Sequence, residues 1–245
     1  MVFFLPDDAY FFPDPHEGEE NGLLAVGGNL SLELLTLAYL QGIFPWFGFK
    51  EEEDILWWCP MDRFVIFPKE IHISHSMRQL INSGRYHATV NKAFGKVIEN
   101  CSTHNQRDAM ERAWLGGRMI PAYKEMHMFG TAASVEVWDE EENLVGGLYG
   151  VNIGNNFFGE SMFSKKPDAS KFALIHLAKQ LESTGGIIDC QFETPHLKSM
   201  GGRHIPYDDY MTYLNKDKEN RTSLRGVLTM GSSLVDLIRQ HIKPL

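Results

Sequence analysis

The strongest constraint on the fold of this chain is a run of three strand-like segments followed by one helix and one further strand. Residues 133–138 alternate between apolar and polar side chains, acidic turn residues occupy 139–143, and an apolar run continues over 144–153. Two such runs joined by a polar turn predict a β-hairpin. The turn at residues 154–156 then predicts a third antiparallel strand, which should end at Glu160.

A helix and a strand are expected to follow this meander. Asp168 should cap a helix over residues 169–182, which Gly185 and Gly186 would end. Residues 187–191 then form a short apolar strand. Three antiparallel strands, a helix and a strand beside them make the layout of an N-acetyltransferase-like sheet. The sequence therefore predicts an α+β fold with a GNAT-like (N-acetyltransferase-like) domain, whose sheet is mixed and mainly antiparallel.

The chain is expected to divide into two domains. Residues 1–65 are rich in aromatic residues and prolines and predict a small N-terminal α/β domain, with a helix at 32–41 and a strand at 55–58. Residues 66–245 would form the GNAT-like domain, with a partly flexible tail over 215–245. Its other expected elements are a strand at 64–67 and helices at 76–82, 91–100 and 119–129.

The composition limits the class of protein. Hydrophobic residues make up 43% and charged residues 22% of the chain, as is typical of soluble globular proteins. No apolar run reaches the length of about 18 residues that a membrane helix needs, and the N-terminus turns acidic at Asp7 without a basic region, so no secretory signal is expected. Three widely spaced cysteines, Cys59, Cys101 and Cys190, favour a reducing cytoplasm over a disulfide framework.

The acidic charge balance bears on the partners of the protein. The formal net charge is −9, whereas proteins that bind long nucleic acids are usually basic. Any contact with nucleic acid should therefore be a local patch whose affinity is sensitive to salt. The same balance would suit a cationic second substrate.

Three polar side chains stand out within the apolar strands. Glu160 follows an aromatic strand, and Asp189 and Gln191 lie two residues apart in the next strand. Because side chains alternate along a strand, Asp189 and Gln191 should share one face, and Cys190 should point the other way as a buried apolar residue. Such a polar pair is either a hydrogen bond that completes a strand end or part of a functional site.

Several aromatic and apolar residues are candidates for binding a ligand. Aromatic side chains can stack on a base or hold an apolar side chain, although core packing is the alternative for each. Leu148 and Leu177 could line an apolar pocket or simply belong to the core. The aromatic candidates are Trp57, Trp58, Tyr123 and Trp114, the last of which precedes a double glycine in a loop, a context typical of a cleft.

Other reaction classes leave little trace in the sequence. An acyl-CoA enzyme of this fold would present a glycine-rich pyrophosphate turn, but no Arg or Gln of this chain has a glycine three residues later. Metal-ligand spacing, a nucleophile elbow and a P-loop are absent from the sequence. We therefore expect no metal and no organic cofactor.

With these residues considered, the chain closely resembles the leucyl/phenylalanyl-tRNA–protein transferases. The resemblance runs in family order from about residue 3 to residue 214. The matching segments are N-G-L-L-A-V-G-G-N-L-S (21–31), G-I-F-P-W-F (42–47), I-L-W-W-C-P (55–60), H-I-S-H-S-M (72–77), G-G-L-Y-G-V (146–151), F-F-G-E-S-M-F-S (157–164), A-S-K (169–171) and I-D-C-Q (188–191).

The resemblance implies an aminoacyltransferase. Such an enzyme moves leucine or phenylalanine, and sometimes methionine, from its tRNA to the α-amine of a protein that begins with Arg or Lys. The product is marked for degradation by the bacterial N-degron pathway. The implied partners are Leu-tRNA, Phe-tRNA and such proteins or peptides, with no membrane partner. The leading alternatives are an acetyl-CoA-dependent acetyltransferase and a non-catalytic binder of basic N-termini.

The resemblance also implies roles for individual residues. Asp189 and Gln191 would lie at the reacting centre with Glu160, where Asp189 orients Gln191 and Glu160 holds the donor's amino group or terminal adenosine. Trp57 or Trp58, with Trp114, would flank the adenosine, and Leu148 and Leu177 would contact the donor side chain. Tyr123 and Ser164 complete the expected substrate-binding set. The candidates for binding tRNA are His75, Arg78, Arg85 and Arg118.

Overall fold

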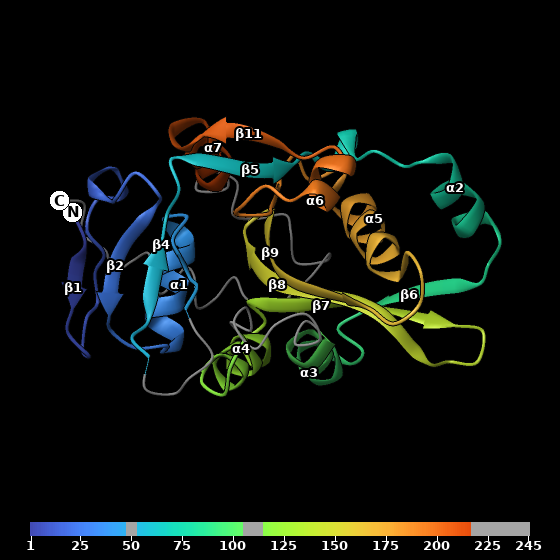
Figure 1. Cartoon of the computed structure of the whole chain (residues 1–245), viewed down its shortest axis with the longest axis horizontal. Coiled ribbons are helices and arrows are strands. Elements are labelled where there is room, and N and C mark those ends of the chain that lie inside the picture. Colours follow the sequence, from blue (N-terminus) through green and yellow to red (C-terminus); the bar gives the residue numbers. More distant parts are fainter. Residues whose placement is uncertain (48–52, 105–114, 217–245) are drawn as a thin grey trace.

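The computed structural model of the chain describes residues 1–47, 53–104 and 115–216 (Figure 1). This part is a mixed α+β structure with one four-stranded and one seven-stranded sheet. Two neighbouring pairs, β1–β2 and β9–β10, are parallel, and the other pairs are antiparallel. The expected mixed, mainly antiparallel arrangement is therefore confirmed, while the division into domains stays a prediction.

The four-stranded sheet is built from the first sixty residues of the chain, in the order β1-β2-β4-β3. The helix α1 packs beside it, and this helix begins after Ser31, whose hydroxyl accepts a hydrogen bond from the backbone N–H of Leu34. The elements are β1 (Phe3–Leu5), η1 (Pro15–Glu17), β2 (Leu23–Gly27), α1 (Leu32–Leu40), β3 (Phe44–Pro45) and β4 (Leu56–Trp58).

The seven-stranded sheet has the order β11-β5-β10-β9-β8-β7-β6 and contains the predicted meander at its centre. Figure 1 shows α5 on one face of this sheet and α3 and α4 on the other. The strands are β5 (Asp62–Ile66), β6 (Tyr86–Val90), β7 (Ala132–Asp139), β8 (Leu144–Ile153), β9 (Asn156–Ser164), β10 (Ile188–Asp189) and β11 (Arg203–Pro206). The helices are η2 (Pro68–Glu70), α2 (His75–Asn82), α3 (Phe94–His104), α4 (Met119–Met128), α5 (Ala169–Leu181), α6 (Pro195–Ser199) and α7 (Tyr207–Asn215).

Three expectations about the central segment are corrected. The third strand does not end at Glu160 but continues to Ser164. Asp168 occupies the position before α5, but it has a left-handed backbone (φ 62°) and its side chain makes no capping bond; its carboxylate pairs with Lys171 instead. The strand expected over 187–191 contains only Ile188 and Asp189.

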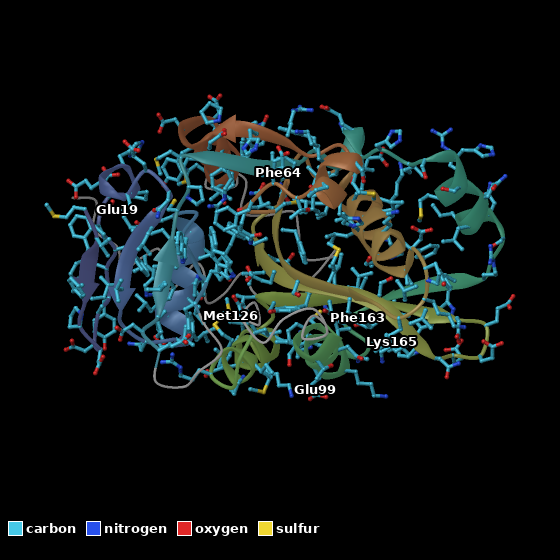
Figure 2. The ribbon with its side chains drawn as sticks, viewed as in Figure 1. Glu19, Phe64, Glu99, Met126, Phe163 and Lys165 are labelled. Atoms are coloured by element: carbon cyan, nitrogen blue, oxygen red, sulfur yellow. The ribbon has the colours of Figure 1, made fainter. Side chains whose placement is uncertain are left out.

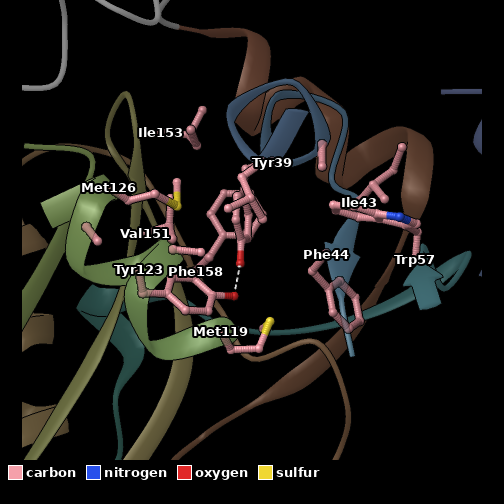
Figure 3. Close-up of a cluster of buried hydrophobic side chains, with 14 of the residues drawn as sticks. Tyr39, Ile43, Phe44, Trp57, Met119, Tyr123, Met126, Val151, Ile153 and Phe158 are labelled. Carbon is pink, nitrogen blue, oxygen red and sulfur yellow. Dashed lines mark hydrogen bonds between the residues drawn. The ribbon is translucent and has the colours of Figure 1, made fainter. Parts of the chain in front are cut away.

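The buried side chains form two clusters on opposite faces of the larger sheet. One cluster, beneath α5, includes Leu148, Leu174 and Leu177. The other is shared between the two sheets, because Tyr39 and Trp57 of the N-terminal region belong to the same cluster as residues of α4, β8 and β9 (Figure 3). Aromatic and aliphatic side chains together form the contact between the sheets. Within it, the ring of Tyr39 on α1 packs edge-on against that of Phe158 on β9, with the ring centroids 5.0 Å apart.

Candidate active site

A buried ion pair lies where β5 and β10 run side by side. Arg63 and Asp189 are both fully buried, and the Nε of Arg63 lies 3.0 Å from each carboxylate oxygen of Asp189. The hydroxyl of Tyr210 donates to Asp189 at 2.7 Å, and the Nη2 of Arg63 donates to the carbonyl of Gly42 at 2.6 Å. Burial, the largest single effect, would lower the pKa of Arg63, but the charge of Asp189 and its hydrogen bond, together with Tyr210 and Cys59, raise that pKa overall. Arg63 is therefore protonated.

Asp189 acts on Gln191 through the backbone. The carboxylate of Asp189 accepts a hydrogen bond of 2.8 Å from the backbone N–H of Gln191. Gln191 has a left-handed backbone (φ 57°), which is uncommon for a residue with a side chain. The chain therefore leaves the strand directly after Asp189, and the expected contact between two side chains on one strand face is replaced by this turn. The Gln191 side chain is turned toward Glu160, with its Nε2 at 3.4 Å from Oε1.

Glu160 occupies a β-bulge between β8 and β9. Tyr149 lies opposite Ser161 and Gly150 lies opposite Gly159, so Glu160 is the extra residue between two pairs. A bulge bends the strand and redirects a side chain, which is why bulges are frequent beside active sites. The carboxylate of Glu160 accepts hydrogen bonds of 2.8 Å from the hydroxyls of Tyr39 and Tyr123. Burial raises the pKa of Glu160 to about 7, although the two tyrosine hydrogen bonds act to lower it.

An apolar cavity of about 300 Å³ opens beside Glu160. Leu148 of β8 and Leu177 of α5, both expected pocket residues, line it. Cys190 also lines the cavity and is partly exposed, where a buried residue was expected. Burial raises the pKa of its thiol, which disfavours the thiolate that a nucleophile would need. The other lining residues are Phe157, Gly159, Ser161, Met162, Leu174, Ile188, Thr194, His196 and Leu197.

The aromatic candidates fall in different environments. Trp57 is fully buried against Phe12 and donates its indole N–H to the carbonyl of Gly27. Trp58 is partly exposed and forms an aromatic cluster with Trp46 and Phe192, whose ring centroids lie 5.5 and 6.5 Å from that of Trp58. Because Phe192 directly follows Gln191, this cluster adjoins the polar groups of the site.

Two further candidates differ in their distance from the cavity. Tyr123 contacts Glu160 directly. Ser164 lies at the end of β9, between Phe163 and Lys165 (Figure 2), and is not among the residues that line the cavity. Its hydroxyl donates to the carbonyl of Lys166 and accepts from the N–H of Ser170, contacts that shape the turn before α5. The prediction for Trp114 falls outside the described residues.

The four basic candidates lie in two separate places. His75 and Arg78 are exposed on α2, and Arg85 is exposed in the segment that follows this helix. Arg118 precedes α4, where its guanidinium covers the ring of Phe47 and donates to the carbonyl of Glu53. Figure 1 shows α2 at one end of the molecule and α4 in its middle, on the opposite side of the larger sheet from α5, so the four residues do not form one local cluster.

The described residues contain neither a grouped set of metal ligands nor a helix that could span a membrane. In that part of the chain, no three His, Cys, Asp or Glu side chains are grouped as metal ligands. Likewise, none of the described helices has both the length and the apolar character needed to cross a bilayer.

Comparison with known proteins identifies the family. Residues 65–215 match the family profile described as leucyl/phenylalanyl-tRNA protein transferase, and residues 28–61 match its N-terminal domain. The chain belongs to this family. Relatives that bear the same name include those of Nitrosomonas europaea (51% identity over 199 residues, 81% of this chain and 82% of the relative) and Flavobacterium psychrophilum (46% over 206 residues, 84% and 96%). A solved structure of L-PGS from Bacillus licheniformis is 16% identical over 71% of this chain and 57% of that chain, with a TM-score of 0.39, too low to support an argument.

Sequence reasoning about this transferase missed three residues of the site. Arg63 left a signal, because it is a charged residue directly before the apolar run Phe64, Val65 and Ile66. Tyr39 and Tyr210 left none, since tyrosines are ordinary residues in helices that pack against a core. Their roles depend on the packing of α1 and α7 against the larger sheet, which local patterns do not encode.

The bulge that holds Glu160 depends on Gly150, which gives a first prediction. A Cβ atom at position 150 would overlap the carbonyl oxygen of Phe158 and lie 2.6 Å from the ring of Phe157. We expect Gly150→Ala to lower the free energy of unfolding by about 3 kcal/mol, measured by urea denaturation. Gly95→Ala in α3 is the matched control, because the nearest atom to its Cβ would be 3.9 Å away, and it should be neutral or stabilising. Equal stability of the two variants would contradict the role given to the bulge.

Proposed function

We propose that this protein transfers leucine or phenylalanine, and also methionine, from aminoacyl-tRNA to the N-terminal α-amine of proteins that begin with Arg or Lys. In this proposal the reaction takes place in the cytoplasm and marks the product for degradation through the N-degron pathway. The larger sheet with α3, α4 and α5 would be the GNAT-like catalytic domain, with aminoacyl-tRNA as the donor in place of acyl-CoA. Membership of this transferase family supports the reaction class, an aminoacyl transfer.

The observation that carries the proposal is the cavity beside Glu160. Apolar side chains form most of its wall, as an unbranched or γ-branched apolar side chain would require, and Ser161, Thr194 and His196 are its polar members besides Glu160. The Glu160 carboxylate meets the amide of Gln191. A donor whose side chain fills the cavity would thus hold its α-amine and ester next to these polar groups.

The ester of an aminoacyl-tRNA is already activated, so the protein mainly needs to position two substrates. We propose that Gln191 hydrogen-bonds the reacting groups and that Asp189 holds the Gln191 backbone in place. Asp189 is fully buried and its oxygens are occupied by Arg63, Tyr210 and the N–H of Gln191. These contacts support a positioning role for Asp189, because its carboxylate has no free edge toward a substrate.

The terminal adenosine of the donor would lie against the exposed aromatic cluster of Trp46, Trp58 and Phe192. Aromatic faces are general stacking platforms for bases, and Trp46 is 42% exposed. The basic residues of α2 and Arg118 would contact the tRNA backbone. The acidic net charge of −9 would favour approach of an N-terminal Arg or Lys.

The direct test is a transfer assay with purified protein. Labelled Leu-tRNA or Phe-tRNA is mixed with a peptide that begins with Arg, and incorporation into the peptide is followed by mass spectrometry. We expect transfer to this peptide and to its Lys counterpart, and none to the same peptide with an acetylated N-terminus. Acetyl-CoA offered in place of the tRNA should give no product. Absence of transfer over a range of salt concentrations would reject the proposal.

A further inference from the structure

Three side chains form a closed triangle of hydrogen-bonding contacts beside the cavity. The hydroxyls of Tyr39 and Tyr123 lie 2.6 Å apart, and they lie 2.8 Å from Oε1 and Oε2 of Glu160, respectively. The two tyrosines come from α1 and α4, so the triangle forms only where the N-terminal region packs on the larger sheet (Figure 3). All three distances are those of hydrogen bonds.

The triangle contains three contacts but only two phenol protons. If both hydroxyls donate to an ionised carboxylate, the 2.6 Å contact between Tyr39 and Tyr123 brings two lone pairs together with no proton between them. A third proton removes this repulsion and gives every contact a donor. Burial, followed by the charge of Glu160, holds the pKa of both phenols well above the ordinary value. Both phenols therefore keep their protons, and the group that gains or loses the third proton is Glu160.

Other charges near the triangle largely offset one another. Asp189 on β10 raises the pKa of Glu160, whereas Arg63 on β5 lowers it, and both effects are smaller than burial. The amide of Gln191 donates weakly to Glu160 at 3.4 Å. Tyr149 on β8 adds a buried hydroxyl whose ring lies 5.4 Å from that of Tyr123, but it makes no hydrogen bond to Glu160.

From this geometry we infer that Tyr39, Tyr123 and Glu160 form one proton-exchanging unit that serves the aminoacyl transfer proposed above. The inference rests on that function. The unit has two states: a neutral state with three protons, and a carboxylate state in which the two phenols stabilise the charge. Glu160 is one of the residues that line the cavity, which places the unit beside the reacting groups.

The proton balance of the reaction fits these two states. The incoming neutral amine forms a C–N bond to the ester carbonyl, and its nitrogen passes one proton to the carboxylate state of the unit. The bond between the carbonyl carbon and the ribose oxygen then breaks, and that oxygen takes a proton from the neutral state. An amine and an ester have become an amide and a ribose hydroxyl, and the unit has returned to its starting state without any other reactant.

The titration of Glu160 suits this role. A general base works best when its pKa lies near the operating pH, and the pKa of Glu160 is raised to about 7. Since the carboxylate state accepts the proton, activity should fall as the pH drops through this value. The Tyr39 and Tyr123 hydrogen bonds lower the pKa of Glu160, so removing either one should raise it.

The first experiment compares pH–rate profiles of Tyr39→Phe, Tyr123→Phe and the unchanged protein. We expect the acidic limb of kcat/KM to move to higher pH by about one unit in each variant, as loss of one hydrogen bond to a charged group implies. Tyr149→Phe is the matched control, since it removes a neighbouring buried hydroxyl and should leave the limb where it was. The titration of the attacking amine is common to all four proteins and cancels in the comparison. If the acidic limbs of kcat/KM coincide in all four proteins, the inference is overturned.

The second experiment needs no substrate and is independent of transfer activity. Infrared difference spectroscopy should detect a protonated carboxyl group that titrates between about pH 5 and 9 and is missing in Glu160→Gln. In Tyr39→Phe the band should persist to higher pH than in Tyr149→Phe. If no carboxyl band is lost in Glu160→Gln, the neutral state with three protons does not form, even where transfer is observed, and the inference fails. If the band is present without transfer, the unit exists and the proposed function fails instead.

Discussion

Replacement of Arg63 by methionine is expected to lower the free energy of unfolding by about 3–5 kcal/mol and to abolish aminoacyl transfer. The substitution leaves Asp189 as a buried carboxylate without its cation, and burial of an uncompensated charge is strongly unfavourable. The same loss should release the backbone of Gln191, which Asp189 holds at 2.8 Å. Urea denaturation and the transfer assay measure the two effects separately.

A second arginine, which forms an ion pair at the surface, tests whether burial is what makes Arg63 important. Arg203→Met is the matched control, because Arg203 pairs with Glu70 where water screens both charges. We expect this variant to lose far less stability than Arg63→Met and to keep its transfer activity.

A double variant separates the charge of Asp189 from its role in holding Gln191. Asp189→Asn keeps an oxygen that can accept from the N–H of Gln191, and its amide N–H can donate to the Tyr210 hydroxyl, but alone it leaves Arg63 unpaired. We expect Arg63→Met combined with Asp189→Asn to be more stable than either single variant and to regain part of the transfer rate. If the stability losses of the two single variants simply add in the double variant, Arg63 and Asp189 are not coupled as described. Recovered stability with no recovered transfer would mean that the negative charge itself is needed at the reacting centre.

The parts of the fold that the sequence predicted are those with strong local patterns. The alternation over residues 133–164 and the helix after Asp168 gave the central meander and α5 within a few residues. The third strand was expected to end at Glu160 because a bulge and a strand end look alike in sequence. β6 (Tyr86–Val90) was missed altogether, because a single edge strand of five mixed residues carries too weak a period to be recognised.

For the candidate site, the sequence indicated several of the residues but not the contacts that join them. Glu160, Asp189 and Gln191 were recognisable as polar residues in apolar surroundings, and the structure connects them through two hydrogen bonds. How they connect could not be predicted, since it depends on a left-handed turn at Gln191 and on partners distant in sequence. Arg63 lies 126 residues from Asp189 and Tyr39 lies 121 residues from Glu160. Contacts of this kind are set by the packing of whole elements.

The cavity beside Glu160 predicts that donor choice can be altered by a single substitution in α5. Leu177 is 1% exposed and lines the cavity, so Leu177→Ala should enlarge it at the wall opposite β8. A leucyl side chain would then lose contacts, whereas a phenylalanyl side chain could fill the added space. We expect the ratio of kcat/KM for Phe-tRNA to that for Leu-tRNA to rise about tenfold, the discrimination that one or two methylene groups provide.

Leu181→Ala is the control that distinguishes donor choice from general damage. Leu181 lies one turn further along α5 and is 4% exposed, but it is not among the residues that line the cavity. Both variants should lose about 2–5 kcal/mol of stability, because each removes a buried leucine side chain. Only Leu177→Ala should change the donor ratio, since only its side chain would contact the donor. If both variants change the ratio equally, or neither changes it, the donor side chain binds elsewhere and this cavity is not the pocket that selects it.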